Sequence, residues 1–335
     1  MHNQAKPLTK RTILVFTVLA LLLVFSVFLY IYSRTYAKAY RLNLAMGPAA
    51  FESIMSRTVP ALAGMTAAAV LIAVLSLSFQ TITGSRILTP SMIGFDSVFI
   101  GTQTVLVFLF GSVSRVFSNP YLNYVIVAGT MVVVSMLMYG FILRKNKKNL
   151  VFLLMFGLIL SGIVRSVTTY LQVIMDTHDY NQVMAATSVT VNNMNTNIIW
   201  VALPLMLGVI LVMLFRHKTY DVLSLGADNA KSLGVPYDRE LKINLFLISI
   251  GMSVATAMIG SLAFLGLLAV NIARELLKTH RYLYLFMGAS ALAALALILG
   301  QATVELLQGS VPVTVIIDLV GCSYMFYLII KENRV

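Results

Sequence analysis

Residues 12–33, TILVFTVLALLLVFSVFLYIYS, carry no charged side chain over their whole length. About 20 consecutive apolar residues are enough for an α-helix to cross a bilayer, so this stretch predicts a transmembrane helix. Lys6, Lys10 and Arg11 precede it, and no small-residue cleavage site follows it. We therefore interpret it as a retained first helix rather than a cleaved signal peptide.

Apolar runs of similar length recur along the rest of the 335-residue chain. They lack the alternation of apolar and polar residues that marks the strands of a membrane barrel. The predicted class is an all-α polytopic membrane protein with about ten transmembrane helices, forming one domain over residues 1–335. The predicted spans are residues 12–33, 58–78, 90–111, 120–142, 149–172, 197–215, 241–259, 262–276, 281–303 and 312–331. The span at 262–276 is too short to cross straight, so it is tilted, buried among other helices or partly re-entrant.

The overall composition supports this class. Hydrophobic residues make up 59% of the chain and charged residues 11%, too few to cover the surface of a soluble domain. The single cysteine, Cys322, excludes an internal disulfide. The net charge of +12 would suit a nucleic-acid partner, but most basic residues lie in short loops beside apolar runs. Such residues set membrane topology, so no nucleic acid is predicted.

The distribution of the 24 Lys and Arg residues predicts the orientation of the chain. With the N-terminus inside, 18 of them lie on the inner side and one, Arg165, lies within a span. The remaining five lie outside: Arg34, Lys38, Arg41, Arg57 and Arg115. The bias predicts that both termini are cytoplasmic, that residues 34–57 and 173–196 are extracytoplasmic loops, and that residues 216–240 are a cytoplasmic segment.

Residues 223–235, LSLGADNAKSLGV, are a polar stretch inside that cytoplasmic segment. Gly234-Val235-Pro236 is a helix-stop sequence, so the stretch predicts a short helix that ends there. A short helix beneath a membrane bundle is either a docking element for a soluble partner or an ordinary loop with a helical turn.

Several residues stand at a spacing that resembles a known family. Pro60 is followed by Gln80 after 20 residues, by Pro90 after ten more and by Gly94 after four more. This order is similar to the first-loop proline, glutamine and "P…LG" element of the FecCD family. These proteins are the permease subunits of ABC importers for iron–siderophores, haem and cobalamin. The stretch at 223–235 likewise resembles the cytoplasmic coupling segment of these permeases.

The C-terminal half carries further motifs of the same family. GSLAFLGL at 260–267 resembles "GxIxFVGL", Arg274 stands at the terminal arginine of the next motif, and THR at 279–281 resembles "DHR". Val311-Pro312 and Gly321 fit the pattern of the last span. The resemblance covers about residues 50 to 331 and implies the type II ABC importer permease fold.

The sequence also departs from the family pattern. The departures are RTVPA at 57–61 in place of "RxPR", SR at 85–86 in place of Asn-Pro, VNIAR at 270–274 in place of "PHxxR", and GCS at 321–323 in place of "GxP". This combination resembles the branch that imports ferric catecholate or mixed catecholate–carboxylate siderophores. Members of that branch often pair two different permeases.

The resemblance implies a set of partners. A second permease subunit, with a heterodimer favoured, would complete the pathway, two cytosolic ATPase subunits would bind the coupling segments, and an extracytoplasmic binding protein would deliver the ferric siderophore. The chain would lie in the inner or plasma membrane of a bacterial cell. It contains no G-x-x-x-x-G-K-[ST] loop, so ATP and Mg²⁺ are expected on the partner ATPase and no cofactor on this chain.

The resemblance also nominates site residues. The residues expected to contact the ATPase are Leu225, Gly226, Ala227, Asp228, Asn229, Lys231 and Gly234. Arg57, with Lys38 and Arg41 by charge and side, is expected to dock the binding protein, although cations that snorkel at a helix end would look the same. Ser85 and Ile87 stand where the family builds part of its cytoplasmic gate.

Arg165 is a charged residue within a predicted span, where an unpaired cation costs about 2.5–3.5 kcal/mol. Ser161, Arg165, Thr168 and Gln172 recur at helical spacing and predict a polar stripe on one face. In the family the fifth and tenth spans line the pathway, so the stripe could face it, with Asp318 as counter-charge. An ion pair that only fixes helix packing is the alternative.

Two other classes of function fit the sequence less well. An ion- or proton-coupled secondary transporter needs intramembrane carboxylates, for which Asp96 and Asp318 are thin support. An intramembrane enzyme needs a catalytic constellation at membrane depth. The four histidines, His2, His178, His217 and His280, lie outside the predicted spans, and no pair has metal-ligand spacing. The chain is therefore predicted to be a transport subunit and not an enzyme.

Overall fold

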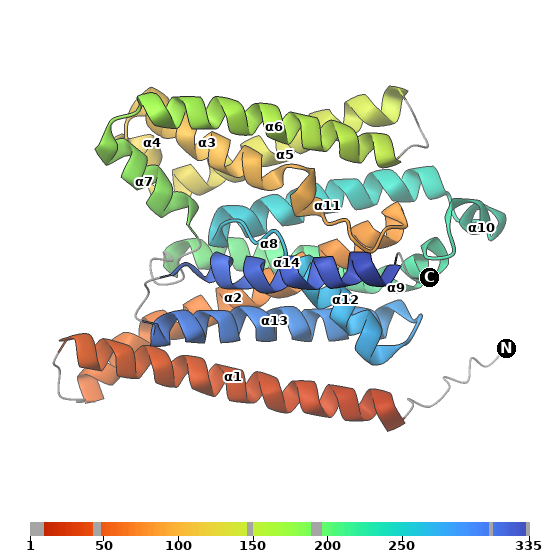
Figure 1. Cartoon of the computed structure of the whole chain (residues 1–335), viewed down its shortest axis with the longest axis horizontal. Coiled ribbons are helices and arrows are strands. Elements are labelled where there is room, and N and C mark those ends of the chain that lie inside the picture. Colours follow the sequence, from red (N-terminus) through yellow and green to blue (C-terminus); the bar gives the residue numbers. More distant parts are fainter. Residues whose placement is uncertain (1–9, 43–47, 146–149, 189–195, 308–310, 333–335) are drawn as a thin grey trace.

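The computed structural model describes residues 10–42, 48–145, 150–188, 196–307 and 311–332. Over these residues the secondary structure is helical, and the long helices run side by side (Figure 1). The elements are α1 (Lys10–Leu42), α2 (Pro48–Thr83), η1 (Pro90–Ile93), α3 (Phe95–Phe110), α4 (Arg115–Ser118), α5 (Pro120–Lys145), α6 (Leu150–Ile174), α7 (Thr177–Thr187), α8 (Thr196–Phe215), α9 (His217–Leu223), α10 (Ala227–Ser232), α11 (Tyr237–Ile259), α12 (Leu265–Leu277), α13 (Tyr282–Leu306) and α14 (Val313–Glu332).

Each of the ten predicted spans corresponds to a helix of this bundle. Within the described residues, seven helices are long and apolar enough to cross a membrane, namely α1, α2, α5, α6, α8, α11 and α13. The apolar parts of α3 and α14 are shorter. With 13 residues, α12 extends only about 20 Å at 1.5 Å per residue, and most of its side chains are buried among its neighbours. It therefore contributes to the interior of the bundle without crossing a bilayer by itself.

The segments between the spans contain more helix than the sequence suggested. Helix α1 continues to Leu42 and α2 already begins at Pro48, so residues 34–57 are mostly helical and not a loop. Residues 173–196 contain α7, and residues 216–240 contain two short helices rather than one. Pro60, near the start of the predicted span 58–78, lies well inside α2, which begins at Pro48. Hydropathy marks the membrane edge, but a helix of polar residues can continue beyond it.

Helix α2 lies at the centre of the bundle, in contact with α8, α11, α12 and α13. Small residues allow these helices to approach closely. A Cβ placed on Gly251 of α11 would overlap Leu75 of α2, and one on Gly266 of α12 would lie 2.7 Å from the Cβ of Ser76. Close backbone approach at glycine is a common way to pack helices in membranes, where apolar burial alone does not drive association.

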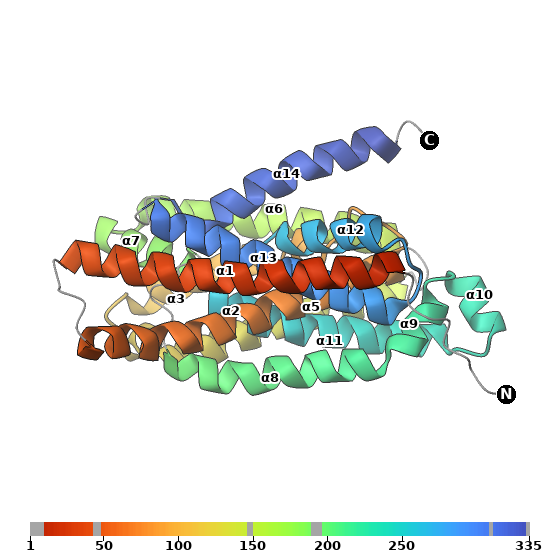
Figure 2. The ribbon, with the colours of Figure 1, turned by 90° about the horizontal axis from the view of Figure 1, so that it is seen from below.

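The same end of the bundle carries the start of α1, the end of α14 and the short helices α9 and α10 (Figures 1 and 2). Helix α14 leans away from the other long helices in Figure 2. It contacts α12 and α13, whereas α6 contacts α3, α5 and η1. The polar segment at 216–240 and both ends of the described chain are therefore placed together.

Candidate functional site: the coupling segment and its anchor

The segment at residues 216–240, called the coupling segment after the role that the family resemblance implies, is attached to the bundle through α9. Helix α9 contacts α2, α8 and α13, and it buries Tyr220 and Leu223. Helix α10 contacts chiefly α9 and α11, and Ala230 is its buried residue. The segment therefore consists of a buried anchor, α9, and a projecting helix, α10, at the end of the molecule (Figure 1).

The end of α10 is built by Gly234. The N–H of Gly234 donates to the carbonyl of Lys231, and the N–H of Val235 donates to the carbonyl of Ala230, both at 3.0 Å. These two bonds form a Schellman motif, which requires a left-handed residue. Gly234 has φ +82°. The predicted helix stop is confirmed, and the reason for glycine is its conformation, since nothing lies within 4 Å of where its Cβ would stand.

The projecting face of α10 is exposed and mixed in character. Leu225 and Leu233 are 54% and 62% exposed. Asp228, Asn229 and Lys231 are exposed between them. Two exposed leucines and three polar side chains therefore lie together on this projecting surface, where a soluble partner could cover them. The two predicted residues Gly226 and Ala227 form the start of this helix, with φ +92° at Gly226.

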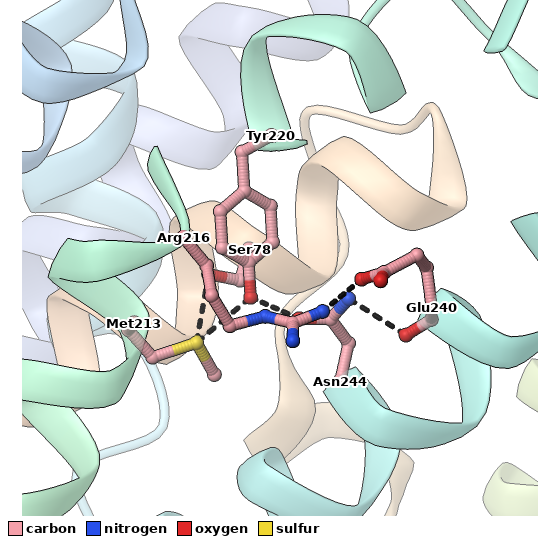
Figure 3. A network of polar contacts seen from close by, with 6 residues as sticks. All are labelled: Ser78, Met213, Arg216, Tyr220, Glu240 and Asn244. Carbon is pink, nitrogen blue, oxygen red and sulfur yellow. Dashed lines mark hydrogen bonds and ion pairs between the residues drawn. The ribbon is translucent and has the colours of Figure 1, made fainter. Parts of the chain in front are cut away.

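Buried polar contacts hold α9 in place, and Figure 3 shows most of them. Arg216 forms an ion pair with Glu240 at the start of α11. The Tyr220 hydroxyl donates to the side-chain carbonyl of Asn244 and lies 2.8 Å from the sulfur of Met213. Burial raises the pKa of Tyr220 to about 12, so the hydroxyl remains protonated and can donate.

The other partner of α9 is the first residue of α13, Tyr282. The rings of Tyr220 and Tyr282 stack with centroids 4.5 Å apart and planes 14° apart. The N–H of Tyr282 donates to the carboxylate of Asp221 at 2.6 Å. The hydroxyls of Tyr282 and Ser78 are 2.8 Å apart. Sequence reasoning missed this contact, because Asp221 and Tyr282 are 61 residues apart and no local pattern joins them.

The turn after α2 is held by two amide side chains. Gln80 and Asn271 each donate from their side-chain nitrogen to the carbonyl of Arg86 at 2.9 Å. Ser85 and Ile87, the predicted gate residues, flank this anchored carbonyl and are half-buried. A role in gating stays a prediction. The spacing of Gln80 matched the family motif. Its hydrogen bond to the carbonyl of Arg86 shows that Gln80 holds the turn after α2 in place.

The expected ion pair between Arg165 and Asp318 is wrong. The two residues form no ion pair in the described structure, because α6 and α14 pack on different neighbours. Asp96 and Asp318 each keep one buried carboxylate oxygen without a hydrogen bond to a described residue. Spacing within one helix cannot reveal which helix stands opposite.

Most of the predicted polar stripe on α6 packs against α3 and η1. Gln172 donates to the hydroxyl of Thr104 at 3.1 Å. Thr168 is buried beside Gly101, and Ser161 fills the space that a Cβ of Gly94 would need. These three positions join α6 to its neighbours, and a pathway role for Gln172 stays a prediction. Only the side chain of Arg165 is exposed, at the edge of the same face.

The outer basic residues differ in environment. Arg57 on α2 and Arg115 on α4 are exposed. Arg34 is only 2% exposed and contacts the Tyr30 hydroxyl and ring on its own helix. Lys38 and Arg41 lie on the last turns of α1, where the side chains are outside the described residues. Arg57 is the one predicted docking residue whose side chain the structure describes as accessible.

A bundle of membrane-length helices with a short polar helix projecting at one end is an arrangement that suits a transport permease. Residues 13–331 match the FecCD transport family. The chain belongs to that family and is a multi-pass permease subunit of an ABC importer, not an enzyme.

Individual relatives agree with this family. The petrobactin import system permease protein YclO of Bacillus subtilis (strain 168) is 38% identical over 78% of this chain and 84% of its own length. The petrobactin import system permease protein FatC of Bacillus anthracis is 30% identical over 85% and 80%. The structure of a metal-chelate type ABC transporter in an inward-facing conformation superposes with a TM-score of 0.76, at 19% identity over 96% of this chain and 99% of that chain. That structural likeness supports the fold.

Proposed function

We propose that this chain forms half of the pathway by which a bacterial ABC importer takes up a ferric siderophore, with catecholate-containing chelates favoured. The relatives named for petrobactin import support this substrate class. A second permease subunit, a different one being favoured, completes the pathway, and an extracytoplasmic binding protein delivers the substrate. ATP and Mg²⁺ bind the partner ATPases. The end that carries α9, α10, the start of α1 and the end of α14 faces the cytoplasm.

The observation that carries the proposal is the projecting helix α10 on its buried anchor. Its exposed residues Asp228, Asn229 and Lys231, with Leu225 and Leu233 on either side of the helix, form a surface for a soluble partner. The partner is the ATPase, because the permease contains no nucleotide-binding loop of its own. Affinity purification of the intact membrane complex from its native host tests this assignment. The expected result is an ATPase that co-purifies with the chain, and its absence would contradict the proposal.

An ion-coupled secondary transporter is the alternative. The half-buried carboxylates Asp96 and Asp318, each with one buried oxygen that has no hydrogen bond to a described residue, are the features that favour it. They lie on α3 and α14, which do not form the paired broken helices of matching halves that such transporters use. The two functions differ in energy source, since only the importer requires ATP hydrolysis by a separate subunit.

Arg57 is proposed as a contact of the binding protein at the opposite end. Arg57→Glu should weaken binding of the loaded binding protein about tenfold at low salt, because a favourable charge pair becomes a repulsive one. Arg115→Glu is the matched control, since Arg115 is also exposed at that end. The dissociation constant should be measured at two salt concentrations, because charge attraction is screened over about 8 Å at physiological salt. Equal effects of the two substitutions would remove Arg57 from the surface.

Arg165 is proposed to face the pathway or the partner permease. A cation exposed to lipid would be costly, so an exposed arginine on α6 implies a polar environment in the assembly. Arg165→Ala should change stability by only about 0.5 kcal/mol, as at other exposed sites. Uptake of an anionic chelate should fall about tenfold, because the arginine raises the local concentration of the anion.

Arg165→Lys is the control and should retain most uptake. Melting temperature and uptake are measured in parallel. A large loss of stability with Arg165→Ala, or unchanged uptake, would contradict the pathway role.

A further inference from the structure

Two consecutive residues of α9 hold the first residue of α13. Asp221 accepts a hydrogen bond from the main-chain N–H of Tyr282 at 2.6 Å. Tyr220 stacks on the ring of the same residue, with centroids 4.5 Å apart. One contact fixes the main chain of Tyr282 and the other fixes its side chain. Helix α9 therefore cannot tilt or slide without displacing the start of α13.

The contact with Asp221 also completes a helix end. The N-cap residue of α13, Arg281, makes no side-chain capping bond. A carboxylate at the N-terminus of a helix satisfies an otherwise unpaired N–H and is favoured by the helix dipole. Asp221 performs this task from another helix. The capping of α13 thus depends on where α9 stands.

The stacked tyrosines touch the central helices of the bundle. The Tyr220 hydroxyl donates to Asn244 of α11 and lies 2.8 Å from the sulfur of Met213 on α8 (Figure 3). The Tyr282 hydroxyl is 2.8 Å from Ser78 of α2. Both rings are buried. A movement of α9 would therefore act on α2, α8, α11 and α13 through directional hydrogen bonds and ring stacking, and not only through apolar packing.

Close packing continues from α13 toward the last helix. A Cβ on Gly288 of α13 would lie 2.5 Å from a methyl of Leu277 on α12, so these two helices are in direct van der Waals contact at this point. Phe264, just before α12, lies against Gly321 of α14, where a Cβ would be 3.0 Å from the ring. Close-packed interiors transmit displacement because they have few voids to absorb it.

We propose that Tyr220 and Asp221 form a two-point clamp on Tyr282 that passes movement of the ATPase-docked segment to α13. The clamp rests on the proposed function of the coupling segment and goes beyond it by naming the residues that carry the motion inward. They are positioning residues, since they touch neither substrate nor nucleotide. The clamp differs from the docking surface, because Tyr220 is fully buried while the docking residues are exposed.

The test uses the importer purified with its native partners and reconstituted in lipid vesicles. The variants are Tyr220→Leu and Asp221→Ala, separately and together, with Tyr220→Phe and Asp221→Asn as conservative partners. Tyr284→Leu is the control, because Tyr284 lies two residues from Tyr282 and its hydroxyl makes no hydrogen bond to a described residue. The readouts are co-purified ATPase, basal ATP hydrolysis, and substrate transported per ATP hydrolysed.

The clamp predicts that the double variant keeps its ATPase and basal hydrolysis but transports about tenfold less substrate per ATP, a typical size for coupling between sites. Tyr220→Phe keeps the stack and Asp221→Asn keeps an acceptor oxygen, so both should stay within about twofold of wild type. In a double-mutant cycle, Tyr220→Leu and Tyr282→Leu should be non-additive in this ratio.

Three results would overturn the clamp. One is a double variant that transports as much per ATP as wild type. Another is a loss of transport that follows melting temperature and is not rescued by the conservative variants, since that describes a merely structural role. The third is additivity of Tyr220→Leu and Tyr282→Leu. A wild-type complex without ATP-driven uptake would overturn the proposed function and the clamp together, whereas with an active wild-type complex these three results count against the clamp alone.

Discussion

Gly234→Val should abolish association of the chain with its ATPase while leaving membrane insertion intact. Gly234 has φ +82° and completes the Schellman motif that ends α10. The left-handed conformation costs an ordinary residue about 1–2 kcal/mol, and a β-branched residue resists it more strongly. Valine should therefore unwind the end of α10 and displace Leu233, which is exposed on the proposed docking face.

The control for this prediction is Gly208→Val. Gly208 is an exposed helical glycine of α8, with nothing within 4 Å of its missing Cβ. The same chemical change there should leave the ATPase bound. Gly234→Asn should be intermediate, because asparagine tolerates the left-handed region better than valine. The measurement is the amount of ATPase that co-purifies with an equal amount of inserted permease. Normal recovery with Gly234→Val would show that α10 is not the docking element.

Gly157→Ala should destabilise the permease by about 3 kcal/mol, the upper part of the range for overpacked interiors. Gly157 lies on α6 against η1. A Cβ there would overlap the side chain of Ile93 and lie 2.8 Å from its carbonyl oxygen. The backbone of Ile93 cannot rotate away as a side chain could, because the following residue, Gly94, is held at φ +115° against Ser161.

Gly162→Ala on the same helix is the matched control. Gly162 is exposed and has nothing within 4 Å of its missing Cβ, so alanine there should be neutral or stabilise the helix by up to about 1 kcal/mol. Ile93→Ala should rescue Gly157→Ala only in part, because the carbonyl remains. The melting temperature of the purified permease, measured for Gly157→Ala and Gly162→Ala, gives the difference in stability between the two variants. Equal melting temperatures for the two glycine variants would contradict the packing described between α6 and η1.

The membrane class and the positions of the long helices could be predicted because a bilayer imposes a length and a composition on every helix that crosses it; the predicted span 262–276 is the short helix α12, which does not cross by itself. The helix stop at Gly234 could be predicted because it depends on neighbours in the sequence. The helical continuation of α1 to Leu42 could not, because polar residues beyond the membrane edge give no hydropathy signal. Pro60 was misplaced for the same reason, since α2 already begins at Pro48.

The candidate site could be predicted only where it is local. The exposed residues of α10 are contiguous in sequence, and the family resemblance pointed to them. The anchor beneath them is made of contacts between distant segments, such as Asp221 with Tyr282, which no spacing rule reveals. The false pairing of Arg165 with Asp318 has the same origin. Each charge could be located in its helix, but the neighbour of that helix is a property of the fold.

The most direct test of an ATP-driven permease is uptake by the reconstituted importer with each energy source supplied alone. Vesicles that contain the complete complex, with the loaded binding protein outside, receive either ATP and Mg²⁺ in the lumen or a proton or sodium gradient. We expect ferric siderophore uptake with ATP and none with a gradient alone, and loss of uptake when this chain carries Gly234→Val. Gradient-driven uptake by this chain without an ATPase would contradict the proposed function.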